Sequence, residues 1–200
     1  MNMLTPAIRT SLYFWVLLLF SYPVFPEWKL VNDESSLHFI SIKASDIAET
    51  HTFKKLSGSV KENGEAHLSI NLTSLETLIP IRNERMGNLL FETKIYPSAV
   101  FRLGIDLEKI LLTEIGKSSD VEYKGVFEFK NKEFPLSVKL KVIRLSEQSF
   151  SVISSEPLLL NAERLGLSRG IEALRVVAGL PSISKSVPVI FSLIFKNRTN

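Results

Sequence analysis

The sequence feature that most constrains the fold is an alternation of apolar and polar side chains with a period of two residues. Every second residue is apolar in EAHLSINL, residues 65–72, and the pattern returns in VEYKGVFEF, residues 121–129, and FPLSVKLKV, residues 134–142. Successive side chains of a β-strand point to opposite faces, so each segment predicts a strand with one buried face. Less regular runs of the same kind occupy residues 28–32, 37–43, 51–61, 99–107, 149–160 and 187–195.

The segments between these runs are mostly short. The sequence KNKE, residues 130–133, separates two alternating runs and predicts a hairpin. A series of short strands with tight connections favours an antiparallel sandwich or barrel over alternating strands and helices. With 200 residues, 45% hydrophobic and 22% charged, the chain can bury the core of one domain. We therefore expect an all-β fold.

Two segments depart from the strand pattern and predict short helices. The first covers residues 81–90 and follows Pro80, a residue suited to a first helical turn. The second is SRGIEALRVVAGLP, in which Ser168 is the expected N-cap and Gly179 the expected C-terminal stop.

The expected inner faces carry many aromatic side chains. Candidate inward positions include Phe101, Phe127, Phe129, Phe134 and Phe191. Gly125 falls in one of these rows and predicts a bend or a close approach of neighbouring atoms. The last run, VPVIFSLIF, is apolar on both faces, which predicts that the barrel interior covers one face and a docked helix the other. A barrel of about eight strands is either filled by its own side chains or wide enough for one small ligand, and both readings stay open.

The N-terminal residues have the layout of a secretory signal peptide. Arg9 is the only charged residue before Glu27, and it precedes the apolar run Ser11–Phe20. This run is short for a membrane span, which needs about 20 apolar residues. Because SYPVFPEW lacks a small-x-small cleavage pattern, we expect residues 1–25 to be either a cleaved signal peptide or an uncleaved anchor. In both cases the protein is exported.

The composition argues against several kinds of chemistry. The chain has no cysteine, which excludes disulfides and thiolate catalysis. Its net charge of +3 is scattered as mixed-sign pairs, which argues against a nucleic-acid partner. His38, His51 and His67 share no metal-binding spacing, and the sequence contains no serine-hydrolase, Walker or Rossmann motif. We therefore expect no catalytic residues and no metal site.

One charged residue falls inside an apolar stripe. On the predicted helix, Arg82 shares a face with Met86, Leu89 and Leu90, and Arg85 lies at the edge of that face. A guanidinium there must reach water or find carbonyl or carboxylate partners. Three roles stay open for Arg82: anchoring the helix, contacting the polar head group of a ligand, or lying on the solvated surface.

Several long stretches together carry a family resemblance. They are EWKLVNDESSLHFISIK, LSINLTSLETLIPIRNERMGNLLFETKIYPSAVF and LLLNAERLGLSRGIEALRVVAGLPSISKSVPVIFSLIF. The chain resembles the YceI-like family of exported lipid-binding proteins over about Trp28 to Phe195. Commoner members have R-D-x-H-L where this chain has Arg82-Asn83-Glu84-Arg85-Met86, so the chain is similar to a proteobacterial side branch of the family.

The resemblance implies a lipocalin-like, antiparallel β-barrel over residues 27–197, located in the bacterial periplasm. It implies a non-enzymatic protein whose apolar interior holds a long isoprenoid or a similar amphiphile, such as an isoprenoid quinone or a polyprenyl chain, with no other cofactor. It leaves room for transient contact with a membrane. Arg82 and Arg85 are the candidates for head-group contact or a structural role. The ten expected interior ligand contacts are Phe39, Leu68, Ile70, Phe101, Leu103, Phe127, Phe129, Leu136, Val138 and Phe191.

Two alternatives to a lipid carrier remain at this point. The first is a filled barrel that acts as a structural or partner-binding module of the periplasm, in which inner phenylalanine side chains meet across the axis. The second is a hydrolase or isomerase acting on a lipid, which would need an acid-base pair inside the cavity.

Overall fold

The computed structural model of the protein describes residues 27–197. The expected signal peptide, residues 1–25, lies outside the described residues. Within residues 27–197, no helix is both long enough and apolar enough to span a bilayer.

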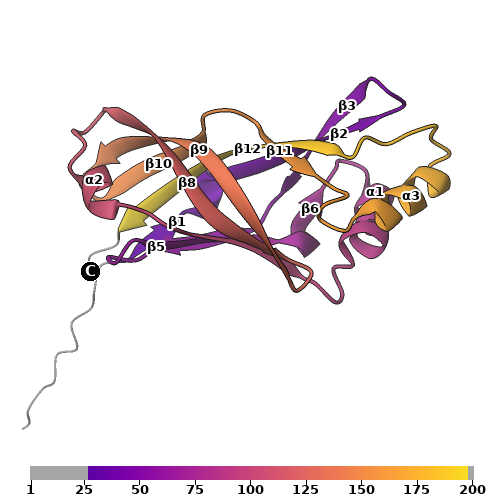
Figure 1. Cartoon of the computed structure of the whole chain (residues 1–200), viewed down its shortest axis with the longest axis horizontal. Coiled ribbons are helices and arrows are strands. Elements are labelled where there is room, and N and C mark those ends of the chain that lie inside the picture. Colours follow the sequence, from indigo (N-terminus) through magenta and orange to yellow (C-terminus); the bar gives the residue numbers. More distant parts are fainter. Residues whose placement is uncertain (1–26, 198–200) are drawn as a thin grey trace, which may run out of the picture.

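The structure consists mainly of strands, with a few short helices (Figure 1). The strands are β1 (Trp28–Leu30), β2 (Ser36–Lys43), β3 (Ile47–Phe53), β4 (Leu56–Val60), β5 (Glu65–Asn71), β6 (Leu75–Glu76), β7 (Ser98–Gly104), β8 (Ser118–Phe129), β9 (Lys132–Ser146), β10 (Ser149–Ser154), β11 (Leu158–Asn161) and β12 (Ser186–Asn197). The helices are α1 (Pro80–Arg85), α2 (Leu107–Leu111) and α3 (Ser168–Val177), with single turns η1 (Asn32–Glu34) and η2 (Leu72–Ser74) and a π-helical segment η3 (Met86–Phe91).

The strands close into an antiparallel barrel. Their pairing order runs β1, β4, β5, β7, β8, β9, β10, β12, and β12 pairs back with β1 through Trp28 opposite Asn197. All of these pairs are antiparallel. The all-β, lipocalin-like barrel expected from the sequence is confirmed, and the sandwich is excluded.

The remaining strands lengthen the barrel wall beyond the closed ring. β2 and β11 pair with the first half of β12, and β3 pairs with β2 and β6. The turn η1 separates β1 from β2, and the side chain of Asn32 bridges the gap by accepting a hydrogen bond from the backbone N–H of Leu56 at 2.7 Å. Figure 1 shows β2 and β3 reaching toward the end of the barrel where α1 and α3 lie.

The two-residue alternation correctly predicts which side chains face inward. On β5, His67 is exposed while Ile70 is buried, and on β9 Lys139 is exposed while Val138 and Leu140 are buried. A single register therefore places every second side chain of a strand inside the barrel.

Gly125 is a point of close approach, as its place in an apolar row predicted. A Cβ atom at this position would lie 2.7 Å from the ring of Phe101 and 2.5 Å from the carbonyl oxygen of Arg102. The missing side chain therefore gives the Phe101 ring its space on the inner face of β8.

Several local predictions about helices need correction. Ser168 begins α3 but is not its N-cap; Leu167 holds that position, without a side-chain capping bond. Gly179 follows the helix with φ +62°, the left-handed conformation expected of a C-terminal stop. The sequence did not predict α2, although Asp106 caps it by accepting a hydrogen bond from the backbone N–H of Lys109 at 3.0 Å.

The predicted helix after Ile79 has Pro80 in its first turn and then changes its geometry. Its second half is π-helical, with hydrogen bonds five residues apart, so the set of side chains that share a face changes. Met86 and Leu90 are buried as expected, but Leu89 is 37% exposed and Phe91 is buried instead.

The expectation that both faces of the last strand are covered is wrong in part. Leu193 and Phe195 of β12 are buried inside the barrel, whereas Ile190 is 41% exposed on the outside. The helix α3 packs against η3 at the end of the barrel and leaves the outer face of β12 uncovered there.

Candidate ligand cavity

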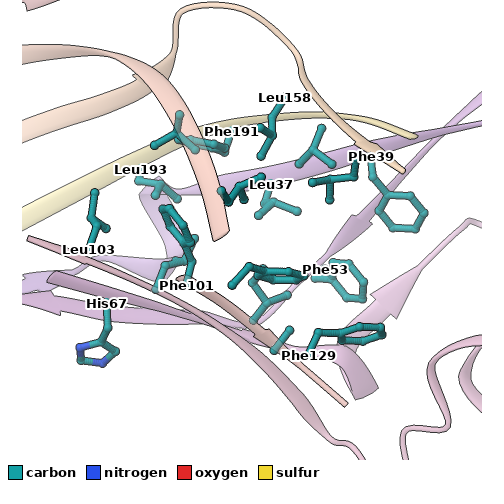
Figure 2. A pocket seen from close by; sticks show the side chains of 18 of the residues that line it. Leu37, Phe39, Phe53, His67, Phe101, Leu103, Phe129, Leu158, Phe191 and Leu193 are labelled. Carbon is teal, nitrogen blue, oxygen red and sulfur yellow. The ribbon is translucent and has the colours of Figure 1, made fainter. Parts of the chain in front are cut away.

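The interior of the barrel holds an apolar cavity of about 220 Å³. Its wall is built from the inward side chains of the strands (Figure 2). Among the lining residues that the structure describes, all are apolar except Tyr123 and His67, and the exposed imidazole of His67 points away from the cavity. The site can therefore bury an apolar ligand and offers it few hydrogen-bond partners.

The structure places all ten of the interior residues chosen from the sequence on the wall of this cavity. They are Phe39, Leu68, Ile70, Phe101, Leu103, Phe127, Phe129, Leu136, Val138 and Phe191. Their contact with a ligand remains a prediction. Phe134 has the same inward phase on β9, opposite Phe127 in the ladder, but it is not part of the wall.

Residues of the helical segments complete the cavity wall at both ends, and sequence reasoning missed these residues. At one end the wall is completed by Leu90 and Phe91 of η3 and by Ile171 of α3. At the other end Ile110 of α2 completes it, and α2 lies at the opposite end of the barrel from α1 and α3 (Figure 1). The sequence does contain one signal for Ile110: Asp106 is a typical helix N-cap residue and marks the start of α2, the helix that carries Ile110.

A cluster of phenylalanine rings forms part of the cavity wall next to η3. Phe39 and Phe53 stack with ring centroids 5.4 Å apart, and Phe91 meets Phe53 edge-on at 5.6 Å. Phe129 also meets the ring of Phe91 edge-on, with ring centroids 6.5 Å apart. Because such contacts add to the stability of the packing, these rings form a firm apolar end to the cavity.

Beyond these rings the inner face of the β2–β3 hairpin becomes polar. His51 lies opposite Phe39 in the ladder, and its Nε2 is 2.8 Å from the hydroxyl oxygen of Ser41. Next along the hairpin, Glu49 pairs with Lys43 at 2.9 Å and with Arg82 of α1 at 2.7 Å. Burial opposes ionisation of Glu49, but hydrogen bonds from Arg82 and Lys43 hold the pKa of this carboxyl below its usual value.

Arg82 is therefore held by protein partners. It donates one hydrogen bond to the Glu49 carboxylate and a second, at 2.5 Å, to the backbone carbonyl of Thr77. The side chain of Arg82 is 23% exposed, so it is neither fully buried nor freely solvated. Arg85 is exposed and, within residues 27–197, has no carboxylate within 4.0 Å. These contacts are those expected of an arginine that anchors α1 to the hairpin.

Replacing Arg82 by methionine is expected to lower the free energy of unfolding by about 2 kcal/mol, because it leaves Glu49 and the Thr77 carbonyl short of a donor. Arg85→Met, on the same helix, is the matched control and should change stability by less than about 0.5 kcal/mol. Urea unfolding of both variants measures the difference. If Arg82→Met unfolds like the parent protein but loses bound lipid, the residue contacts the head group instead.

The buried His51 should make stability depend on pH. Burial, and next the nearby Arg82 guanidinium, lower the pKa of His51 to about 4. In the unfolded chain an ordinary histidine has a pKa of about 6.5, so between these values the unfolded state binds more protons and stability falls as the pH falls. For this group alone the loss between about pH 7 and pH 5 is about 2 kcal/mol. Thermal unfolding of His51→Gln should lose this slope, whereas His67→Gln should keep it.

No group of three potential metal ligands occurs among residues 27–197. Of the three histidines, His38 and His51 lie on adjacent strands but on opposite faces of the hairpin, and His67 is on the outside of β5. The cavity wall suits an apolar molecule, and residues 27–197 offer no cluster of side chains that would hold a metal ion.

The closed antiparallel barrel and its apolar interior define this protein as a lipocalin-like β-barrel with an internal site for a hydrophobic molecule. Residues 28–195 match the sequence model of the YceI-like domain, and the chain belongs to this family. A search of curated proteins gave no match.

Solved structures show the same fold. A polyisoprenoid binding domain from Saccharophagus degradans, described as implicated in plant cell wall breakdown, is 36% identical and superposes with a TM-score of 0.84; the match covers 86% of this chain and 98% of that one. BcnA from Burkholderia cenocepacia is 18% identical, with a TM-score of 0.63 over 82% of this chain and 98% of its own. The second similarity concerns the fold alone.

Proposed function

We propose that this protein binds a long-chain isoprenoid or a similar amphiphilic lipid, such as an isoprenoid quinone or a polyprenyl chain, and carries it in the periplasm. The observation that carries this proposal is the continuous apolar wall of the cavity, from Phe91 at one end to Ile110 at the other. The Saccharophagus relative, named for polyisoprenoid binding and 36% identical, supports the same class of ligand.

The energetics of the cavity favour an occupied state. Each methylene of a tail that leaves water for this interior contributes about 0.8 kcal/mol. An unfilled apolar void costs about 24 cal/mol per Å³, so a cavity of about 220 Å³ corresponds to about 5 kcal/mol. This is comparable with the whole stability of a small domain, about 5–15 kcal/mol. A ligand that fills the cavity would therefore stabilise the barrel considerably.

The contacts available inside the cavity point to binding without transformation of the ligand. Tyr123 is the polar side chain of the described wall that faces inward, and burial raises the pKa of its phenol, which keeps it protonated. A hydrolase or isomerase would need a second group to pair with it as acid and base. With so few polar contacts, ligand choice should depend mainly on the length and width of the cavity.

The alternative of a filled structural barrel is less well supported. It requires inner phenylalanine side chains that meet across the axis, whereas Phe39, Phe53, Phe91 and Phe129 gather toward one end and leave the cavity beside them.

The experiment that tests the proposal is native mass spectrometry, with lipid extraction, of the protein purified from its own host. We expect a mass above that of the polypeptide and an extractable prenyl or other long-chain lipid. The purified protein should also take up added prenyl quinones. Protein that is uniformly free of ligand, and that takes up neither prenyl quinones nor fatty amides, would contradict the proposal. Fractionation of the host, with the N-terminus of the recovered protein sequenced, tests the periplasmic location and the processing of residues 1–25.

A further inference from the structure

Four consecutive apolar residues are exposed just before and within α1. Leu78 is 87% exposed, Ile79 44% and Ile81 50%, and Pro80 between them is exposed as well. We call Leu78–Ile81 the apolar tip. Single exposed apolar residues are common on soluble proteins, but a continuous run of four is unusual and indicates a surface that meets an apolar partner.

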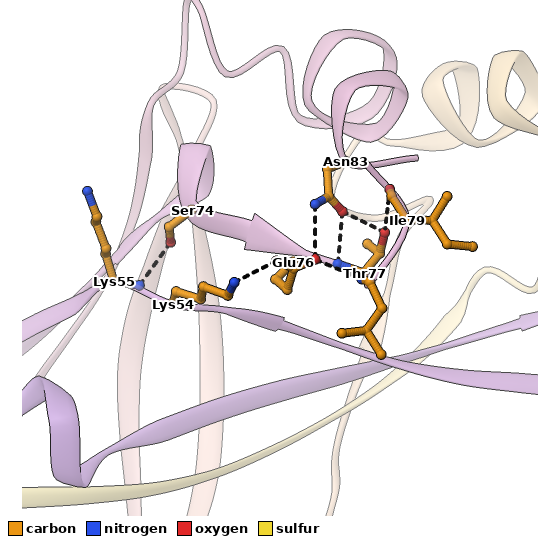
Figure 3. A network of polar contacts seen from close by, with 8 residues as sticks. Lys54, Lys55, Ser74, Glu76, Thr77, Ile79 and Asn83 are labelled. Carbon is orange, nitrogen blue, oxygen red and sulfur yellow. Dashed lines mark hydrogen bonds and ion pairs between the residues drawn. The ribbon is translucent and has the colours of Figure 1, made fainter. Parts of the chain in front are cut away.

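The apolar tip is held by a network of hydrogen bonds beneath it (Figure 3). The side-chain oxygen of Asn83 accepts from the backbone N–H of Thr77 at 2.8 Å and from the Thr77 hydroxyl at 2.5 Å. The carboxylate of Glu76 accepts from the backbone N–H of Leu78 at 2.7 Å and is paired with Lys54 at 2.6 Å. Because Thr77 is only 1% exposed, this network fixes the base of the tip inside the protein.

Leu78 has an unusual backbone conformation. Its φ of +64° lies in the left-handed region, where glycine is unstrained but a residue with a bulky side chain is strained. Burial of the side chain does not compensate for this strain, since Leu78 is the most exposed large hydrophobic residue in the described part of the chain. A strained residue held rigidly with its side chain in solvent is typical of a functional position.

The apolar tip lies at one end of the ligand cavity. It leads through α1 into η3, whose residues Leu90 and Phe91 form part of the cavity wall. Figure 1 shows α1 and α3 together at this end of the barrel, and α3 packs against η3. We call α1, η3 and α3 together the helical cap. Val176 and Val177, at the end of α3, are 61% and 47% exposed and add apolar surface to this cap.

The charges on this helical cap favour an anionic partner. Arg85, Lys94 and Arg169 are exposed, and within residues 27–197 none of them has a carboxylate within 4.0 Å. The two acids on α1 and α3 are Glu84, which is exposed, and Glu172, which is paired with Arg175 at 2.6 Å. These cations lie on α1, on α3 and just after η3, the elements that form this end of the barrel. An apolar tip and unpaired cations on the same group of elements match the interface of a bilayer with anionic phospholipids, where apolar side chains insert and basic side chains meet the head groups.

We propose that the apolar tip docks the barrel onto the surface of an anionic lipid bilayer, with the helical cap of the cavity facing the membrane. The inference rests on the proposed function in one respect: docking would place this end of the cavity next to a membrane that holds the lipid. The docking itself is independent of any ligand and is measured without one.

The test is flotation of the protein, as recovered from its host, with vesicles made of equal parts phosphatidylethanolamine and phosphatidylglycerol. Leu78→Gly combined with Ile81→Ser removes two exposed apolar side chains, and glycine also relieves the strain at position 78. We expect the double variant to bind vesicles about tenfold or more weakly than the parent protein, because each inserted side chain contributes on the order of 1 kcal/mol or more. Thermal unfolding should show no loss of stability, which separates docking from folding.

Leu112→Ser is the matched control. Leu112 is 77% exposed and follows α2 at the opposite end of the barrel, so its removal should leave vesicle binding unchanged. All variants share the same N-terminus, so any membrane affinity of that segment is common to them. Parent protein that does not float with these vesicles at low salt, or Leu112→Ser that loses as much binding as the double variant, would overturn the proposal. Failure of lipid uptake with vesicle binding intact would count against the carrier function alone.

Discussion

Leu68→Trp is expected to reduce the amount of lipid that the protein retains by about tenfold or more. Leu68 lies on β5 with its side chain on the cavity wall, opposite Phe101 in the ladder. An indole at this position would take up space needed by at least two methylene groups of a tail, and each excluded methylene costs about 0.8 kcal/mol of binding, so two reduce affinity about tenfold. Lipid extraction and uptake of a prenyl quinone measure the loss.

A variant on the opposite face of the same strand separates blocking from general damage. His67→Trp introduces the same side chain at an exposed neighbouring position and should retain lipid like the parent protein. Leu68→Trp should also unfold at the same temperature or higher when no ligand is bound, since the new ring fills part of a void. Equal lipid retention by the two variants would show that the cavity is not the binding site.

Gly125→Val is expected to destabilise the fold by about 3 kcal/mol. Strand propensity alone predicts the opposite sign, because valine is preferred over glycine in strands. In the barrel, however, a Cβ at position 125 would lie 2.5 Å from the carbonyl oxygen of Arg102 and 2.7 Å from the Phe101 ring. For a domain of this size the melting temperature should fall by about 10 °C. Gly104→Val is the control, because a Cβ at Gly104 meets nothing within 4 Å.

A double-mutant cycle identifies the cause of this effect. Gly125→Ala and Phe101→Ala should each destabilise the protein, but their combination should cost less than the sum, because removal of the ring relieves one of the two close contacts. Purely additive effects, or a Gly125→Val variant as stable as Gly104→Val, would mean that the ring of Phe101 does not need the space above Gly125.

Much of the barrel wall can be predicted from sequence because strand periodicity is local. A side chain's face depends only on whether its position in the strand is odd or even, which is why residues such as Leu68, Phe127 and Val138 were placed on the inner face. The helical ends were harder to predict. The cap residue Asp106 was overlooked within an expected strand, and the π-helical turn exchanged Leu89 for Phe91 at the buried position.

The partners of Arg82 could not be predicted from its neighbours in sequence. The helical pattern identified a charge within an apolar stripe, but its carboxylate partner, Glu49, lies 33 residues earlier, on β3. This pair forms only because β2 and β3 extend past the closed ring and reach the helical cap.

For the apolar tip, too, the sequence shows the residues but not their surroundings. The run Leu78-Ile79-Pro80-Ile81 is visible in the sequence, where Pro80 predicts the first turn of a helix. Only the tertiary structure shows that its side chains lie in solvent, because the buried network around Thr77 turns the chain outward and holds Leu78 in a left-handed conformation.

The sequence by itself determined the class of fold and the inner face of each strand, since both follow from the spacing of apolar side chains along a single segment. The tertiary structure decided whether those faces meet or leave room between them. The size of the cavity depends on how far apart the closed ring of strands holds opposite walls, and on the helices that cover its ends. These are distances between residues far apart in the chain, and no local pattern encodes them.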